Sequence, residues 1–321
     1  MTVTDTLTLP GQLHRVLDQV RIAEDVTAAT VGHREIEADN ARDLQRLLSA
    51  ALYDVLHAGM DAEPGSLPFH IRSPEFEGRL AGAVPHRSTH ASAVVCAAPG
   101  AEGDSVLLLR DGVRVWTARD KVLTPGPMAE GQQVLVSAAA ARPALSPGFF
   151  LVDGSQPVLR RGPVLRVYVH LTDPDRAVEA WRVALRLLED RQAHYRAKVL
   201  SSGRLYPRRD ALVVYLRDGS WDLAGVLAES LDGLPGLGDG VSLFARPLAK
   251  GIAAAWEPSD RRTGMQGLSF GQHRAGVLAH ALIDHAKGSG PLPEKIAEGF
   301  AEAQIALGDL ASNTDSPQGV I

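Results

Sequence analysis

The sequence predicts an α+β protein with a helical N-terminal part, a central β-rich part and a C-terminal mixed sheet with flanking helices. Three observations support this fold class: helical spacing of apolar residues near the N-terminus, a two-residue hairpin turn in the middle, and strands interleaved with helices towards the C-terminus. With 321 residues and 45% apolar content, the chain can bury a sizeable core. We therefore expect three regions, at residues 1–62, 63–150 and 151–321.

The first region has the apolar spacing of helices. Leu13, Val16 and Val20 recur at intervals of three and four residues. The run ADNARDLQRLLSAALYDVLHAG (38–59) places its leucines and valine on one face, and Gly59 is expected to end that helix.

The second region is predicted to be rich in strands and irregular turns. Two alternating apolar runs, VLLLR (106–110) and VRVWTA (113–118), flank Asp111-Gly112, which is a strong signal for a two-residue hairpin turn. A further strand is expected at QQVLVSA (132–138).

The third region begins with a strand of clean alternation, VLRVYVHL (164–171). In this strand Arg166, Tyr168 and His170 share one face. Asp173 is expected to cap the next helix, with Pro174 at its first position.

Two more strands and three helices complete the third region. Strands are expected at AKVLSS (197–202) and at ALVVYLRD (211–218), the latter apolar enough to be central. A helix is expected in WDLAGVLAESLDGL (221–234) and another from Pro293 to Ala311. Between them, Ser269 and Gln272 match a capping box at the start of a helix.

Composition excludes several classes of protein. The net charge of −5 argues against a general nucleic-acid binder. Cys96 is the single cysteine, so an internal disulfide is impossible and a reducing compartment fits. Without an 18-residue apolar run or a secretory signal pattern, we expect a cytoplasmic protein with no membrane partner. The absence of P-loop, Rossmann, kinase and metal-ligand motifs predicts neither an organic cofactor nor a metal.

The segment 160–217 is basic within this acidic chain. It holds thirteen Arg and Lys against six Asp and Glu, a local charge of +7. A solvated helix surface would explain several of the arginines. Arg166, Lys198, Arg208 and Arg209 are explained less well in this way, because they lie on or next to strands. The group predicts a cationic pocket for a phosphate-bearing substrate.

The helix that begins at Ser269 offers a second anion site. A helix N-terminus presents free N–H groups and partial positive charge, Gly271 permits close approach, and Arg274 lies one turn further on. The alternative is an ordinary capped helix with a surface arginine. Residues 267–271 also match G-x-S-x-G, but a polar stretch precedes them instead of a strand, which favours the cap over a serine nucleophile.

Lys198 and His170 are the predicted reactive pair. Neighbouring positive charges disfavour the protonated form of a lysine, so Lys198 is the candidate base. Histidine titrates near neutrality, so His170 is the candidate acid. Together with arginine clamps, these groups suit the elimination of phosphate. The alternatives are a surface lysine and a packed strand histidine.

The order of these segments resembles the HopA-type effector family. The matching stretches cover about half of the chain: PGFFLVDG (147–154), VYVHLTDPDRAVEAWRVALRLL (167–188), YRAKV (195–199), YPRRDALVVYL (206–216), FARPLAKGIAAAWEP (244–258) and SFGQHRAGVLAHAL (269–282). The N-terminal third carries only LYDVLHAG (52–59).

The family is distantly similar to phosphothreonine lyases, and this resemblance implies roles for individual residues. Lys198 corresponds to the base and His170 to the acid. The lyase pattern has a lysine two residues before the histidine; Tyr168 stands there in this chain, so Arg166 is the alternative source of charge. The implied phosphate clamp and its supporting residues are Arg209 and Arg274, with Asp210 orienting, and Arg208, Tyr195, Ser269 and Gln272 as additions.

The resemblance also implies a function. Relatives in lanthipeptide (class V) and thioamitide biosynthesis look like partners of an aminoglycoside-phosphotransferase-like kinase. That kinase phosphorylates Ser or Thr of a precursor peptide, and the lyase eliminates phosphate to leave dehydroalanine or dehydrobutyrine. Two alternatives stay open. One is a non-catalytic partner that binds the peptide or the kinase, and the other is a type III effector.

Overall fold

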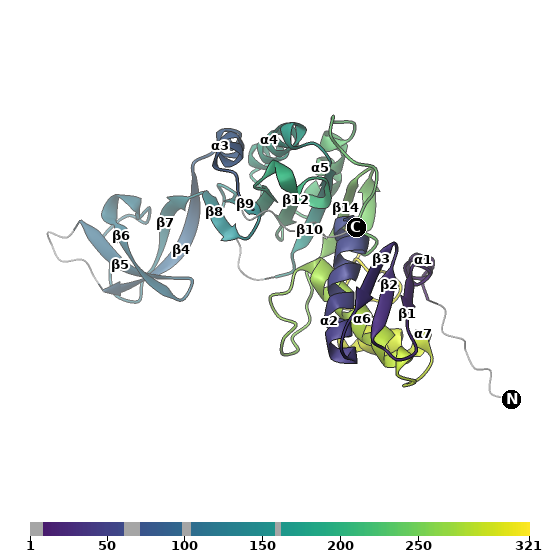
Figure 1. The fold of residues 1–321 in the computed structure, drawn as a ribbon. Helices are drawn as coiled ribbons and strands as arrows, with labels where there is room; N and C mark the ends of the chain where they lie inside the picture. The colour runs from purple at the N-terminus through teal and green to yellow at the C-terminus, as the bar shows by residue number, and fades with distance from the viewer. Residues whose placement is uncertain (1–8, 61–70, 98–103, 158–161) are drawn as a thin grey trace.

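The computed structural model describes residues 9–60, 71–97, 104–157 and 162–321. A seven-stranded sheet forms its centre, with helices on both faces, and a small four-stranded sheet projects from one end (Figure 1). This arrangement confirms the α+β class.

The strand order of the large sheet is β13-β14-β10-β12-β11-β9-β8. The apolar β12 lies at its centre, as its sequence predicts. Every pair within this sheet is antiparallel, so the expectation of a mixed sheet was wrong in this respect. The strands are β8 (Ala141–Ser146), β9 (Phe149–Asp153), β10 (Leu165–Leu171), β11 (Tyr195–Leu200), β12 (Arg208–Leu216), β13 (Arg246–Ala249) and β14 (Ile252–Trp256).

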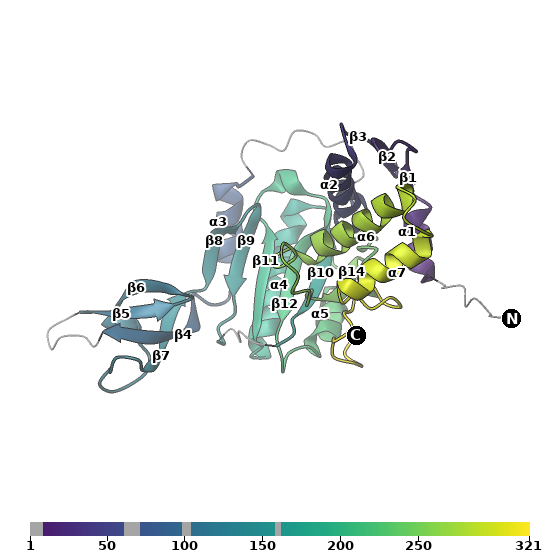
Figure 2. The same cartoon turned by 90° about the horizontal axis from the view of Figure 1, so that it is seen from below.

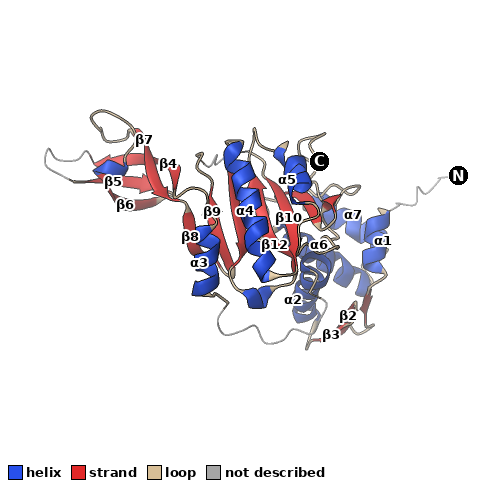
Figure 3. Ribbon diagram, turned by 90° about the horizontal axis from the view of Figure 1, so that it is seen from above, coloured by secondary structure: helices blue, strands red, loops and turns tan. Residues whose placement is uncertain are grey.

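One face of the sheet is covered by α3 (Pro74–Gly82), α4 (Pro174–Asp190) and α5 (Leu223–Leu231) (Figure 3). The Asp173 side chain accepts hydrogen bonds from the first turn of α4, and Pro174 is its first residue, as predicted. Val167 and Val169 of β10 point into this core. Alternation along β10 therefore leaves Arg166, Tyr168 and His170 on the other face.

The second face is covered by elements from both ends of the chain. α2 (Ala41–Leu52) packs against α6 (Phe270–Ala286), and α7 (Leu292–Glu302) packs behind α6. A single π-helical turn, η1 (Tyr53–Ala58), follows α2 and ends at Gly59 in the left-handed conformation. Residues of α1, α2, β10 and α6 share one core, so the N-terminal region packs on the C-terminal sheet (Figure 2).

Two helix predictions near the chain ends need correction. The last helix stops at Glu302 rather than Ala311, because Gln304 has a positive φ and Ile305 instead pairs with Asn313. The N-terminal region is also not purely helical. After α1 (Gly11–Leu17) it forms a three-stranded antiparallel sheet of β1 (Val20–Ile22), β2 (Ala28–Val31) and β3 (Arg34–Glu37).

The four-stranded sheet has the order β6-β5-β4-β7. The expected hairpin is confirmed: Asp111 and Gly112 join β5 to β6, and both have positive φ. The strands are β4 (Ser88–Ala97), β5 (Ser105–Arg110), β6 (Val113–Ala118) and β7 (Gln133–Ala139). Among the described residues, no helix has the length and apolar character required to cross a membrane.

Candidate functional site

Strand register brings basic side chains together on the face of the sheet that carries α2 and α6. Lys198 of β11 pairs with Val213 of β12, which pairs with Tyr168 of β10. Directly paired residues of antiparallel strands point to the same face, so Lys198 and Tyr168 share one row. By the same pairing, Arg196 and Arg166 share the next row, with Tyr215 between them.

A cavity of about 380 Å³ opens over these rows. Two arginines and a lysine contribute to its wall, and among the described lining residues only Glu257 is acidic. The lining residues are Ser146, Leu151, Val164, Arg196, Lys198, Tyr215, Arg217 and Glu257. A cavity with this lining favours an anion.

Neither carboxylate near the cavity neutralises Lys198. Asp153 is buried and is bound by both Arg196 (2.6 Å) and Arg142 (2.7 Å). Glu257 forms an ion pair with the buried Arg166.

The Lys198 ammonium makes no hydrogen bond or ion pair with any described residue. It lies 3.9 Å from the centre of the Phe149 ring. The Arg208 guanidinium is 5.9 Å from the centre of the same ring, so two cations meet around Phe149. A cation over an aromatic face is stabilised without being neutralised, which leaves the ammonium available to a ligand.

Beside Lys198, Arg208 and Asp210 form a buried, doubly hydrogen-bonded ion pair. The Arg208 Nε and Nη2 atoms donate to the two Asp210 oxygens at 2.7 and 2.8 Å. The Tyr53 hydroxyl bridges the pair, at 3.0 Å from Asp210 Oδ2 and 2.9 Å from Arg208 Nη2. Burial alone would raise the pKa of Asp210, but the Arg208 guanidinium holds it well below its usual range. Asp210 was expected to orient the phosphate clamp, and in the structure both of its oxygens accept hydrogen bonds from Arg208.

His57 is buried and contacts residues on several elements around the site. Its Nδ1 lies 2.8 Å from Ser242 Oγ, and its Nε2 lies 4.0 Å from Asp210 Oδ2. Its ring packs edge-on against Tyr168 and so closely on Gly271 that a Cβ there would lie 2.3 Å from it. Burial lowers the pKa of His57 to about 4, so the ring is neutral at pH 7.

Sequence reasoning missed both residues that η1 contributes, Tyr53 and His57. They lie more than 100 residues before the strands they contact, in a stretch whose apolar spacing predicts only a helix. The resemblance of LYDVLHAG (52–59) to the family is the one signal that points to them. It also left Arg217 without a specific role, although this residue lines the cavity.

His170 and Arg209 lie apart from Lys198. His170 shares the sheet face with Lys198, but β12 separates their strands, and two strand spacings alone amount to about 10 Å. The His170 Nδ1 is 2.9 Å from the Gly240 carbonyl oxygen, which only accepts, so Nδ1 carries a proton. Arg209 Nη1 donates to the backbone carbonyls of Val55 and Leu56. Burial lowers the pKa of His170, and the positive charge of Arg209 lowers it further.

Four predicted site residues take other places. Arg274 is fully buried and donates to Leu310, Ser312 and Asn313, so it fastens the C-terminal segment to α6. Tyr195 points into the opposite core and donates to Glu189.

Ser269 and Gln272 bind each other's backbone in a complete capping box. The cap is therefore confirmed over the serine nucleophile. The hydroxyl of Ser269 is used by the helix itself, as it accepts a hydrogen bond from the Gln272 N–H.

The family model of the HopA1 effector protein family matches residues 140–311. The chain belongs to this family. The match contains all seven strands of the large sheet, and Lys198, His170 and Arg208 with them; Tyr53 and His57 lie outside it.

Two solved structures of effector proteins from Pseudomonas syringae are similar in fold. The one from pathovar tomato strain DC3000 is 15% identical, with a TM-score of 0.49, and the alignment covers 87% of this chain and 91% of that one. The one from pathovar syringae strain 61 is 15% identical, with a TM-score of 0.48, covering 85% and 92%. Among curated proteins there is no match.

The buried His57 predicts a specific dependence of stability on pH. A histidine with a pKa of about 4 when folded and about 6.5 when unfolded stabilises the fold above pH 6.5, and that contribution is lost as pH falls towards 4. The free energy of unfolding of the parent should therefore fall as the pH is lowered from 7 to 5. In His57→Gln this fall should be smaller, by up to about 2 kcal/mol. Urea unfolding at the two pH values measures this.

His280→Gln, at an exposed position of α6, serves as the control and should follow the parent curve. If His57→Gln keeps the full pH dependence of the parent, His57 is not held neutral in the folded protein.

Proposed function

We propose that this HopA1-family protein is a carbon–oxygen lyase that eliminates phosphate from phosphoserine or phosphothreonine in a polypeptide. The observation that carries the proposal is the un-neutralised Lys198 ammonium in a cavity lined by Arg196 and Arg217. This reaction requires a base that removes the α-proton and cationic groups that bind the phosphate.

Arg217 is the first candidate for the phosphate clamp. It lines the cavity and has no ion pair with any described residue. Arg196 also lines the cavity, but it shares its charge with Asp153. Arginine suits a phosphate because its planar guanidinium can donate two parallel hydrogen bonds.

The proposed step balances without an external reagent. The Lys198 ammonium first gives a proton to solvent. The neutral amine then takes the proton from Cα of the phosphorylated residue, and the electron pair of that C–H bond forms the Cα=Cβ double bond. The Cβ–O bond breaks, and inorganic phosphate leaves with its electron pair. The products are phosphate, a protonated Lys198 and dehydroalanine or dehydrobutyrine. No electron is gained or lost overall, so the step requires no redox cofactor.

His170 is the proposed proton donor to the leaving phosphate. Its Nδ1–H is held by Gly240, so the second ring nitrogen, Nε2, is the one that can carry the transferred proton. Burial lowers the pKa of His170, whereas a phosphate dianion close to the ring raises it. We therefore propose that His170 is protonated only when substrate is bound. His170 lies at the Arg208 end of β12, whereas Arg217 follows the opposite end of that strand. A phosphate that takes its proton from His170 would therefore be held by Arg208, and a phosphate held by Arg217 would take its proton from water.

The family membership and the resemblance to lanthipeptide (class V) and thioamitide proteins favour a peptide substrate. In that setting the substrate is a precursor peptide phosphorylated by an aminoglycoside-phosphotransferase-like kinase. Incubation of the purified chain with a synthetic phosphopeptide, in the absence of kinase, separates this proposal from a non-catalytic partner. Loss of phosphoric acid from the peptide supports the lyase, and binding without loss supports the partner.

Replacement of Lys198 tests the base. Lys198→Ala should lower the elimination rate by a factor of about 10²–10⁴, because a positioned general base typically contributes that much. Phosphate release and the mass of a synthetic phosphothreonine peptide measure the rate. Lys287→Ala, at an exposed helix end, is the control. Elimination at the parental rate in Lys198→Ala would remove Lys198 from the mechanism.

Replacement of Arg217 tests the clamp. Arg217→Gln should weaken phosphopeptide binding by about 1.5–3 kcal/mol, roughly tenfold or more, since a charge-assisted hydrogen bond is lost. The non-phosphorylated peptide should bind both proteins equally. Arg186→Gln, on the exposed side of α4, is the control. Equal affinities of Arg217→Gln and the parent for phosphopeptide would exclude this clamp.

A further inference from the structure

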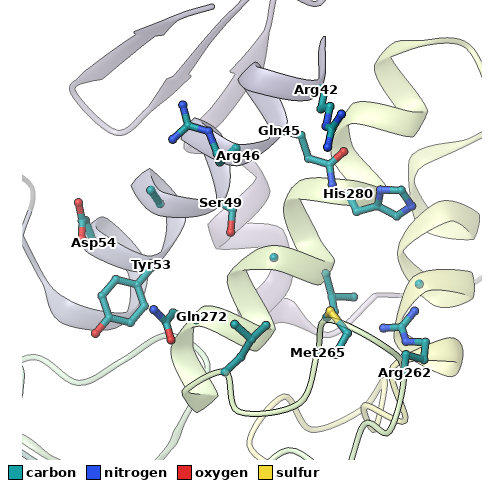
Figure 4. A pocket seen from close by; sticks show the side chains of 15 residues that line it. Arg42, Gln45, Arg46, Ser49, Tyr53, Asp54, Arg262, Met265, Gln272 and His280 are labelled. Carbon is teal, nitrogen blue, oxygen red and sulfur yellow. The ribbon is translucent and has the colours of Figure 1, made fainter. Parts of the chain in front are cut away.

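A second and larger cavity, of about 770 Å³, lies between α2 and α6 (Figure 4). Its α2 wall is a stripe of residues three or four apart, from Arg42 to Tyr53, and its α6 wall runs from Gln272 through Gly276 to His280. The eleven helical steps from Arg42 to Tyr53 span about 16 Å, which is the length of about five extended residues. We call this cavity the α2–α6 groove.

The groove has an apolar floor. Leu268, Met265 and Val277 line it. Gly276 and Gly299 contribute no side chains, and a Cβ at Gly276 would only touch Ser49 Oγ at 3.6 Å. The two helices are in contact, and the missing side chains of Gly276 and Gly299 add to the space of the groove.

The rim of the groove is positively charged. Arg42 and Arg46 are exposed, and neither side chain forms an ion pair with any described residue. Arg262 also lines the groove, but Asp260 and Glu302 bind it. Asp54, the one acidic residue among the described residues of the lining, forms an ion pair with Arg34 at 2.6 Å. The groove therefore presents two available cations above an apolar floor.

One end of the groove meets the candidate site. Tyr53 lines the groove, and its hydroxyl contacts both Arg208 and Asp210. A chain lying in the groove would therefore run towards the side chains that surround Lys198.

We infer that the α2–α6 groove binds a polypeptide segment in which acidic residues alternate with apolar ones. The apolar side chains would pack on the floor, and the acidic ones would face Arg42 and Arg46. The inference that the groove binds such a segment is independent of the proposed function. The further step, that this segment belongs to the substrate of the elimination, rests on the proposed function.

Fluorescence anisotropy tests the binding without any reaction. The probes are labelled peptides of roughly ten residues, a length that exceeds the groove, with alternating Glu and Leu or alternating Gln and Leu. The Glu peptide should bind more tightly, and the difference should shrink as salt is added, because exposed charges are screened. Arg42→Glu/Arg46→Glu should lower the affinity for the Glu peptide roughly tenfold and change the affinity for the Gln peptide little.

The matched control is Arg186→Glu/Arg191→Glu, a pair of exposed arginines of α4 and its C-cap on the opposite face. Equal loss in both double variants would mean a general charge effect and overturn the inference, as would an unchanged affinity in Arg42→Glu/Arg46→Glu.

A kinetic arm separates the groove from the chemistry. With a phosphothreonine peptide that carries the Glu–Leu extension, Arg42→Glu/Arg46→Glu should raise KM and leave kcat unchanged. Lys198→Ala should lower kcat and leave the anisotropy of the Glu peptide unchanged. If the Glu peptide binds through Arg42 and Arg46 but no phosphate is released from any peptide, the lyase proposal fails and the groove stands.

Discussion

The buried ion pair between Arg208 and Asp210 is the interaction on which the site depends. Both oxygens of Asp210 are used by Arg208, and one of them also binds Tyr53. The buried Asp210 carboxylate is thereby neutralised, and Lys198 forms no ion pair with any described residue. The same pair ties η1 of the N-terminal region to the central strand of the sheet. Removing one partner of such a pair typically costs about 3–5 kcal/mol, because the other is left charged and buried.

The two faces of the large sheet differ in the side chains that they carry. The face under α4 and α5 is apolar along β10, β12 and β11, and a large part of the core packs on it. The face towards α2 and α6 carries Arg166, Arg196 and Lys198 in adjacent rows. On that second face Arg166 is paired with Glu257 and Arg208 with Asp210, whereas Lys198 and Arg217 line the cavity.

Local patterns in the sequence predict those parts of the fold that depend on neighbours along the chain. Alternation in residues 164–171 identifies β10 and its polar face, Asp173 and Ser269 identify two helix starts, and Asp111-Gly112 identifies the hairpin. The strands of the N-terminal region are not predicted, because each has only three or four residues and shows too little alternation.

The composition of the site depends on long-range packing, which a single sequence does not reveal. Whether an arginine is free or bound is decided by segments far away in the chain. Arg274 donates hydrogen bonds to the C-terminal segment, and Arg166 forms an ion pair with Glu257. Arg217 forms no ion pair with any described residue. Tyr53 and His57 reach the site only because α2 packs on α6.

The most direct measurement of the central claim is the fate of a phosphothreonine peptide deuterated at Cα, incubated with the purified chain. Elimination with Lys198 as the base predicts a dehydrobutyrine product that has lost the deuterium, formed more slowly than from the undeuterated peptide. Release of phosphate with threonine and its deuterium retained would indicate hydrolysis of the phosphate ester. That result would contradict the account.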